Sequence, residues 1–180
     1  MLFRIVFLWG LVFFVNADPI PSAFADVAKE ANIPVKLFYA TILTESRAPI
    51  KQNGRIKELP WPWTLNVSGQ AKRFRTRKAA YDYLKAVLAQ GIKQVGIGYG
   101  QHEWRWHKHR YKTLWDSLDP YKNLKVTAEI LREIFDGDIP HCRRSWINTV
   151  GCYHRLRGKP KDRIIAIKYT IRVLEQWKNI

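Results

Sequence analysis

The feature that most constrains the fold is a break in helical periodicity between residues 48 and 75. Helix-breaking residues interrupt this stretch at Pro49, Gly54, Pro60 and Pro62. Within it, residues 63–67 have strand character, and residues 68–70 would turn the chain back towards residues 72–74. We therefore expect a small β-hairpin in the middle of a chain that is otherwise helical.

Apolar residues at helical spacing predict helices on both sides of this break. The expected helices are residues 22–31, 34–45, 76–90 and 119–136, then a short helix with Trp146, Val150 and Tyr153, and a last helix. The last helix is expected to bury one aliphatic stripe, formed by Ile164, Ile167, Ile171 and Leu174. No linker divides the 180 residues, so the predicted class is α+β, predominantly α, in a single domain.

The first seventeen residues have the order of a secretory signal peptide. Arg4 provides a positive charge, residues 5–15 are almost all apolar, and small residues end at Ala17. An uncleaved anchor is the alternative, but a spanning helix needs about 20 apolar residues. A weaker second cleavage site ends at Ala25. We expect residues 1–17 to be removed and residues 18–180 to be exported.

Charge and cysteine content fit an exported protein. The chain carries 31 basic and 15 acidic residues, for a net charge of +16, which predicts a polyanionic partner. The candidate polyanions are nucleic acid, anionic lipid and an acidic polymer outside the cell, and export makes intracellular nucleic acid the least favoured of the three. Cys142 and Cys152 are the only cysteines, and an oxidising compartment predicts a disulfide between them.

Glu45 is the candidate acid of this sequence. It lies three residues after Ile42 and seven after Phe38, so it continues the apolar face of its helix. A carboxyl group held against a core loses water, which favours its protonated form, as a general acid for glycoside cleavage requires. The alternative is a frayed helix end with Glu45 in solvent, and Arg47 nearby favours the charged form.

The segment after residue 95 contains closely spaced glycines and a group of histidines and tryptophans. Gly96, Gly98 and Gly100 lack the spacing of a nucleotide-binding loop, but they permit a close backbone approach beside Gln101, whose amide suits sugar hydroxyls. An ordinary tight loop is the alternative. The tryptophans could stack on sugars or pack in the core. The histidines at 102, 107 and 109 lack helical metal-ligand spacing, so we expect a solvated basic loop and no metal site.

In this order, the segments resemble the lytic transglycosylases of the goose-type-lysozyme-like fold, especially those of conjugative elements associated with type IV secretion. The matching segments are Thr44-Glu45-Ser46, Gly98-Tyr99-Gly100-Gln101, residues 119–124 and residues 150–154, with residues 60–67 similar to the conjugative-element subgroup. The chain departs from that pattern at Gly100, where methionine is usual, at Arg47, and at Cys152 and His154 beside Tyr153.

This resemblance implies a lysozyme-like domain over residues 18–180 that acts in the periplasm. It implies cleavage of the β-1,4 bond between N-acetylmuramic acid and N-acetylglucosamine in peptidoglycan, with a 1,6-anhydromuramyl product and no cofactor. The implied partners are glycan strands and components of a conjugation or type IV secretion apparatus. The implied roles are catalysis by Glu45 and substrate binding by Ser46, Gly98, Tyr99, Gln101 and Tyr153.

Three other functions are alternatives from the sequence. A lysozyme-type hydrolase would use the same acid with a second carboxylate, for which Glu103 is a candidate. A non-enzymatic module would dock on the wall or on a secretion apparatus. A nucleic-acid binder would use the interleaved aromatic and basic residues, but the export signal and the lack of a binding motif disfavour it.

Overall fold

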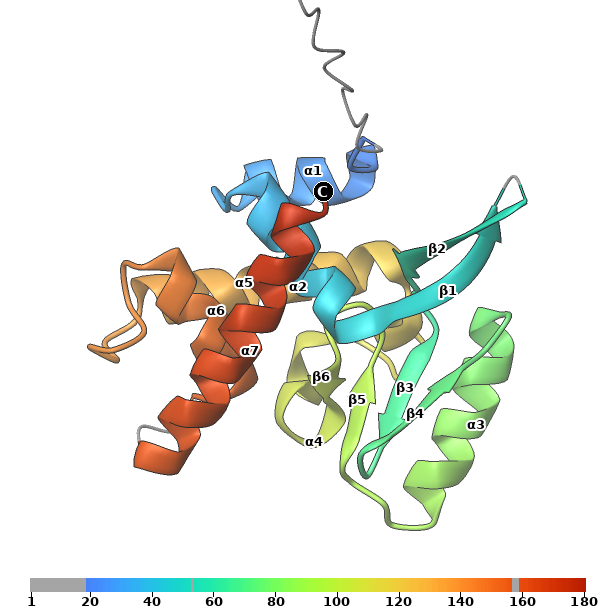
Figure 1. The fold of residues 1–180 in the computed structure, drawn as a ribbon. Helices are drawn as coiled ribbons and strands as arrows, with labels where there is room; N and C mark the ends of the chain where they lie inside the picture. The colour runs from blue at the N-terminus through green and yellow to red at the C-terminus, as the bar shows by residue number, and fades with distance from the viewer. Residues whose placement is uncertain (1–18, 53, 157–158) are drawn as a thin grey trace, which may run out of the picture.

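Helices and strands separate into two packed parts in the computed structural model, which describes residues 19–52, 54–156 and 159–180 (Figure 1). The α-helices are α1 (Ser22–Glu30), α2 (Val35–Ser46), α3 (Arg77–Ala89), α4 (Trp104–His107), α5 (Pro120–Asp136), α6 (Trp146–His154) and α7 (Pro160–Lys178). The strands are β1 (Arg47–Gln52), β2 (Arg55–Pro60), β3 (Thr64–Val67), β4 (Gln70–Arg73), β5 (Val95–Ile97) and β6 (His102–Glu103), and the 3-10 helices are η1 (Lys108–Arg110) and η2 (Asp116–Leu118). The predicted class, α+β and predominantly α, is confirmed.

The helical part is built around α2, which is buried on nearly all sides. Phe38, Ala40 and Ile42 have no exposed surface, and α2 packs against both α1 and α7. The same core takes residues from α5 and α6, including Leu131 and Val150. The end of α2 is therefore fixed within the helical part, which gives the residues at that end defined positions.

The second part is a small antiparallel sheet with the order β4-β3-β5-β6, packed against α3. The predicted hairpin is its β3–β4 pair, in which Thr64 lies opposite Arg73 and Val67 opposite Gln70. Leu65, Leu84 and Ile97 form its core with other buried residues. Strand β5 brings the glycine-spaced segment next to β3, so the sheet positions the predicted substrate loop.

A second hairpin, β1–β2, was not predicted and follows α2 without a loop. Its register runs from Arg47 opposite Pro60 to Gln52 opposite Arg55. The prolines that suggested irregular structure are accommodated because proline is tolerated in edge strands. The backbone N–H of Trp61, just after β2, donates to the carbonyl of Ser46 at 3.0 Å, so the hairpin returns to the end of α2.

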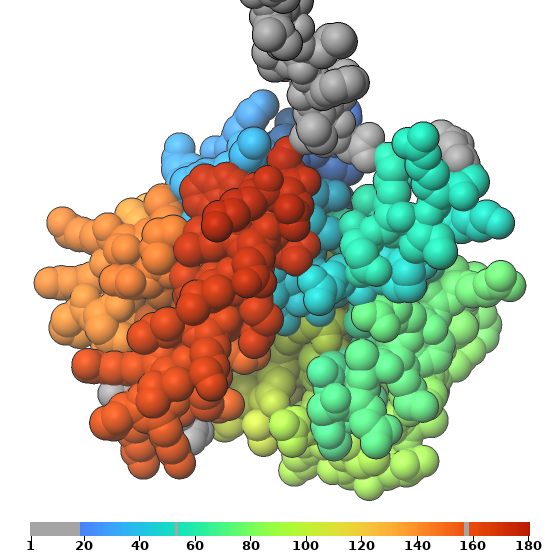
Figure 2. All heavy atoms as spheres, in the orientation of Figure 1, coloured from blue at the N-terminus to red at the C-terminus, as the bar shows by residue number. Residues whose placement is uncertain are grey.

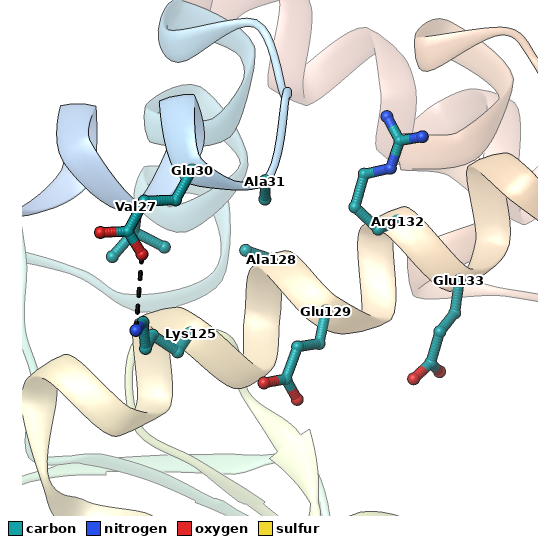
Figure 3. Close-up of a pocket in the computed structure, with 8 residues that line it drawn as sticks. All are labelled: Val27, Glu30, Ala31, Lys125, Ala128, Glu129, Arg132 and Glu133. Carbon is teal, nitrogen blue, oxygen red and sulfur yellow. Dashed lines mark ion pairs between the residues drawn. The ribbon is translucent and has the colours of Figure 1, made fainter.

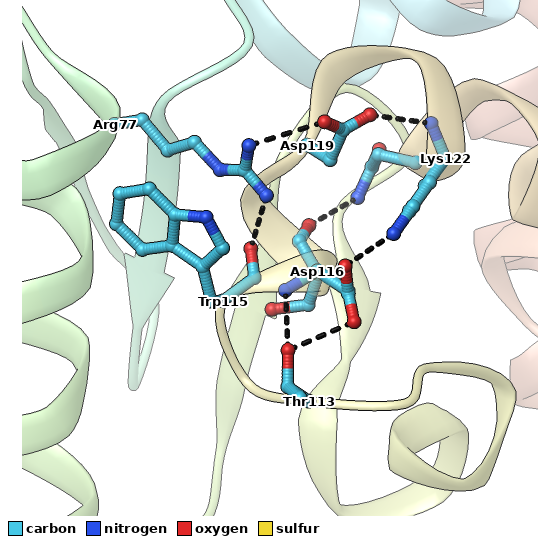
Figure 4. A network of polar contacts seen from close by, with 8 residues as sticks. Arg77, Thr113, Trp115, Asp116, Asp119 and Lys122 are labelled. Carbon is cyan, nitrogen blue, oxygen red and sulfur yellow. Dashed lines mark hydrogen bonds and ion pairs between the residues drawn. The ribbon is translucent and has the colours of Figure 1, made fainter.

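A polar network joins α3 to the start of α5 (Figure 4). Asp119 caps α5 by accepting a hydrogen bond from the backbone N–H of Lys122 at 3.0 Å. The Arg77 guanidinium donates to Asp119 Oδ2 at 3.1 Å and to the carbonyl of Trp115 at 2.8 Å. The sheet part and the helical part are thus linked through one helix cap.

The last helix forms as predicted, but the predicted buried stripe on it is wrong. Ile164, Ile167 and Ile171 are 56%, 59% and 50% exposed. Helix α7 instead packs on α2 and α6 through the face that carries Tyr169 and Val173. The buried face of α7 also holds polar groups that form hydrogen bonds inside the fold. The helical spacing of apolar residues is therefore less clear on the buried face than on the exposed face with the isoleucines.

The predicted disulfide is confirmed. It joins Cys142, in the segment that precedes α6, to Cys152 within α6. Cys142 and Cys152 are bonded at 2.05 Å and both are buried. The predicted signal peptide, residues 1–17, lies outside the described residues. Among the residues that the structure describes, no helix combines the length and apolar character needed to cross a membrane.

Candidate functional site

Glu45 lies at the end of α2 with its carboxyl group largely enclosed. The side chain is 13% exposed, and its Oε1 accepts a hydrogen bond from the hydroxyl of Tyr169 at 2.7 Å. Tyr169 comes from α7, so the carboxyl is held by a residue far away in the sequence. The frayed, solvated helix end considered above is not what the structure has.

The phenol of Tyr169 is fixed as a hydrogen-bond donor. Complete burial, followed by the nearby charge of Glu45, raises the pKa of Tyr169 well above its usual value. The hydroxyl therefore keeps its proton over the physiological range and donates it towards Glu45. Because Oε1 is occupied in this way, Oε2 is the oxygen left to exchange a proton with a ligand.

His154 lies on the same side of the carboxyl. Its ring stacks on that of Tyr169, with centroids 4.3 Å apart and planes 3° from parallel. Its Nδ1 lies 3.9 Å from Glu45 Oε1, beyond direct hydrogen-bonding distance. His154 therefore braces Tyr169 and, when protonated, places a positive charge beside the carboxyl.

Tyr153 links α6 to the glycine-spaced loop. Its hydroxyl donates to the carbonyl of Gly100 at 2.6 Å. Burial, followed by the charge of Glu45, raises the pKa of Tyr153 well above its usual value, so this group too stays protonated. Tyr153 thus contacts the loop of residues 98–101 and lies within electrostatic range of Glu45, while the substrate-binding role expected for these residues stays a prediction.

The loop itself is held against β3 by hydrogen bonds. The N–H of Gly98 and the side-chain amide of Gln101 both donate to the carbonyl of Thr64, at 2.9 and 3.1 Å. The Gln101 amide also donates to the carbonyl of Gly98 at 2.7 Å. Gly98 has φ +76°, and Asn123 leaves no room there for a Cβ, so both conformation and space require glycine.

Gly100 is required for a different reason, which is close packing. A Cβ on Gly100 would lie 2.2 Å from Thr127 Oγ1, 2.5 Å from His102 Nε2 and 2.8 Å from the Tyr153 hydroxyl. The space for a larger side chain is therefore filled by a polar cluster of this chain. Glycine at position 100 therefore lets the loop backbone lie close to Thr127, His102 and Tyr153.

His102 belongs to that cluster and is buried, so the expected solvated loop is wrong at this residue. Its Nε2 lies 3.0 Å from Thr127 Oγ1 and its Nδ1 2.7 Å from the Tyr111 hydroxyl. The Thr127 hydroxyl donates to Asn123, so His102 carries its proton on Nε2 and accepts from Tyr111. Burial, with smaller effects of His107 and Arg110, lowers the pKa of His102 to about 3.

Two of the predicted substrate-binding residues have other contacts. The ring of Tyr99 packs edge-to-face on Phe24, with centroids 5.2 Å apart, and burial, with a smaller effect of Tyr39, raises the pKa of Tyr99 to about 12. The hydroxyl of Ser46 is buried and donates to the carbonyl of Ile42 at 3.0 Å. These residues support the walls of the site from the helical side.

The aromatic residues of the middle segment divide between packing and exposure. Trp61 and Trp63 meet edge-to-face at 5.8 Å, and Trp63 and Trp104 pack against the sheet core. Trp106 is 60% exposed.

The surface between α7 and the strands β3 and β4 is recessed, with the end of α2 at its upper edge (Figure 2). The Glu45 end of α2 thus adjoins a hollow of the surface.

Tyr169 and His154 are site residues that sequence reasoning missed. Tyr169 was hidden because the neighbouring isoleucines form a stronger apolar stripe. A weaker pattern was present, since Ala166, Tyr169, Val173 and Trp177 also follow helical spacing. His154 was noted only as a departure beside Tyr153, and nothing in the sequence pairs it with Glu45.

A separate hollow of about 420 Å³ lies between α1 and α5 (Figure 3). None of the predicted site residues lines it. Its charged groups are engaged in ion pairs, such as Lys125 with Glu30 at 3.4 Å and Arg110 with Glu133 at 2.5 Å. Charges satisfied in this way indicate a structural role for this hollow.

One possible metal-ligand group occurs among the described residues, formed by His141, Cys142 and Cys152. Their donor atoms lie within 4.8 Å of one another. The two sulfurs are bonded to each other, however, and the thiolate is the form of cysteine that binds metals. In the oxidised protein, the two cysteines are therefore not available as thiolate ligands for a metal ion.

No family model, no curated protein and no solved structure matches this chain. The arguments on function below therefore rest on the geometry around Glu45 and on the sequence segments that surround it.

Proposed function

We propose that this protein is an exported lytic transglycosylase that cleaves the glycan strands of peptidoglycan. The observation that carries the proposal is the enclosed carboxyl of Glu45, held on one oxygen by Tyr169 and close enough to Tyr153 for its charge to act on that phenol, which itself bonds to Gly100 of the loop. A single enclosed acid with one free oxygen suits a reaction in which the same group first gives and then takes a proton.

In the proposed reaction, Glu45 protonates the oxygen that links N-acetylmuramic acid to N-acetylglucosamine. The bond from that oxygen to the muramyl anomeric carbon breaks, and the muramyl acetamido group stabilises the positive charge, as in other substrate-assisted glycosidases. Glu45, now a carboxylate, then removes the proton from the muramyl 6-hydroxyl, whose oxygen bonds to the anomeric carbon. The products are a 1,6-anhydro end and a free N-acetylglucosamine end, and no water is consumed.

The contacts of Glu103 disfavour the hydrolase alternative. Its carboxylate accepts two hydrogen bonds from Arg105, at 2.6 and 3.1 Å. A bidentate ion pair of this kind stabilises the charged carboxylate and occupies both oxygens. Glu103 is therefore poorly suited to act as a second catalytic carboxylate, which supports a mechanism with Glu45 alone.

The decisive test is a peptidoglycan-clearing assay with mass analysis of the products. We expect Glu45→Gln to lose clearing by at least about a hundredfold, because the amide cannot transfer a proton. The matched control is Glu58→Gln, which removes an exposed acid from the adjacent hairpin and should keep full activity. Anhydro ends are expected from the unaltered protein.

Other outcomes would contradict the proposal in distinct ways. Reducing ends in place of anhydro ends would indicate a hydrolase. Equal clearing by the unaltered protein and Glu45→Gln would remove Glu45 from its role. Retained wall binding with no clearing by either protein would indicate a docking module.

A further inference from the structure

The outward face of α7 carries an apolar patch that the described fold does not use. Ile164, Ile167 and Ile171 follow spacing i, i+3, i+7 and are each at least half exposed. Ile147 of α6 is a further exposed isoleucine, 41% exposed, on the helix that packs against α7. Contiguous apolar patches on a protein surface commonly mark interaction sites.

Local helix stability does not explain these isoleucines. Isoleucine is a weaker helix former than alanine, leucine or lysine, so an exposed helix face gains nothing from three of them. The face of α7 that stabilises the fold is the opposite one, where Tyr169 and Val173 are buried. The outward face is uncovered by other described elements (Figure 2).

A groove runs beside this patch, between α6 and α7. It has a volume of about 260 Å³, and Ile167 lies on its wall together with His141, Asn148, Arg155 and Arg163. The lining thus combines an apolar edge with groups that donate hydrogen bonds or carry positive charge. Acidic side chains of a partner can pair with the positive groups of this groove, and apolar side chains can pack on its apolar edge. Its concave shape encloses them more than a flat surface would.

The charges around the patch are nearly all positive. The exposed basic residues of α7 are Lys161, Arg163, Lys168, Arg172 and Lys178, whereas Glu175 is the exposed acid of this helix. Such a rim repels a second copy of the same face, and the whole chain has a net charge of +16. It attracts a partner with negative charge beside its apolar surface.

We propose that the isoleucine patch and the α6–α7 groove bind an acidic amphipathic helix of another protein. Its apolar face would lie on Ile164, Ile167 and Ile171, in the helix-in-groove mode of recognition. Its acidic side chains would pair with the basic rim and enter the groove near Arg163. The proposal does not rest on the proposed enzymatic function, because Tyr169, which holds Glu45, lies on the opposite side of α7.

The test measures binding of the exported chain to a synthetic amphipathic peptide with leucines on one helical face and glutamates on the other. Ile167→Ser combined with Ile171→Ser should weaken binding by roughly tenfold or more, because two side chains lose their buried surface in the complex. The matched control is Ile56→Ser, which changes a 73% exposed isoleucine on β2 and should bind like the unaltered protein. Lys168→Glu with Arg172→Glu should also weaken binding, and added salt should do the same.

Several results would overturn the proposal. Equal binding by the patch variants and the control would do so, as would equally tight binding of a peptide with lysines in place of the glutamates. If the patch variants lost binding to anionic lipid vesicles but bound the peptide like the unaltered protein, the patch would be assigned to a membrane surface. Self-association of the unaltered protein that the patch variants lose would assign the patch to a second copy. A large fall in the melting temperature of the patch variants would assign it to the fold.

Discussion

At the scale of single residues, the neighbours of Glu45 divide its two oxygens between different tasks. Oε1 accepts from Tyr169, and Tyr169 is itself braced by the stacked ring of His154. In the proposed reaction, Oε2 is the oxygen that meets the substrate. A proton donor benefits from being held in one orientation, because misplacement by about 1 Å costs a large part of the rate.

Removing the tyrosine hydroxyl tests this arrangement. We expect Tyr169→Phe to lower the free energy of unfolding by about 1–3 kcal/mol, because a buried hydrogen bond to an acidic group is lost. Clearing of peptidoglycan should fall as well, since Glu45 loses its orienting partner. Tyr121→Phe, which changes an exposed tyrosine of α5, serves as the control and should leave both quantities unchanged. Thermal unfolding and the clearing assay measure the two effects.

At the scale of elements, α6 has a central position. It carries Tyr153, which reaches the glycine loop, and His154, which braces Tyr169. Its start is capped by Ser145, whose side chain accepts from the backbone N–H of Asn148 at 3.4 Å. The disulfide from Cys142 to Cys152 then fixes the preceding segment against it.

We expect the double variant Cys142→Ser/Cys152→Ser to lose about 2–3 kcal/mol of unfolding free energy, on the chain-entropy model for a short closed loop. Urea unfolding of the oxidised protein and the variant measures this difference. The unaltered protein in excess reductant should resemble the variant. Equal stability of all three would contradict a stabilising role for the bridge.

Most of the helices could be predicted because their ends carry strong local signals. Thr76 caps α3 and Asp119 caps α5 with their side chains, and Gly91, just after α3, has φ +78°. The β1–β2 hairpin was missed because its prolines suggest irregular structure, although the Asn53-Gly54 pair between the strands is a typical sequence for a two-residue hairpin turn. The inner face of α7 was missed because packing against α2, and not the strongest apolar period, decides which face is buried.

The candidate site was predicted only in part, for a related reason. Glu45 and the glycine-spaced loop were suggested by local patterns, Tyr153 was suggested only by the family resemblance, and the fold joins Tyr153 to Gly100 of that loop. Tyr169 could not be identified, because its role depends on where α7 docks. Gly100 is explained by the positions of Thr127 and His102, which no local pattern in the sequence reveals.

At the scale of the whole molecule, the buried His102 makes stability depend on pH. Its pKa is about 3 in the folded protein and about 6.5 in an unfolded chain. As the pH falls below about 6.5, the unfolded chain therefore takes up the proton first, and the folded state loses stability until about pH 3. The stabilising effect of the neutral imidazole is fully present above pH 6.5.

We expect the free energy of unfolding to be lower at pH 4.5 than at pH 7.5, with about 2 kcal/mol of the difference due to His102. His102→Gln should show a smaller difference between the two pH values, although it is less stable at both. His109→Gln changes an exposed histidine and should keep the pH dependence of the unaltered protein. Urea unfolding curves at the two pH values measure these differences.

The hydrogen bond between Glu45 and Tyr169 spans 124 positions of the chain. Ribosomes synthesise Glu45 well before Tyr169, so a polypeptide that stops before α7 has the carboxyl without the group that orients it. The arrangement that we propose for proton transfer by Glu45 therefore forms only after α7 has been synthesised and has docked on α2. Under the proposed function, unfinished copies of the chain lack the oriented acid and do not cut the cell wall.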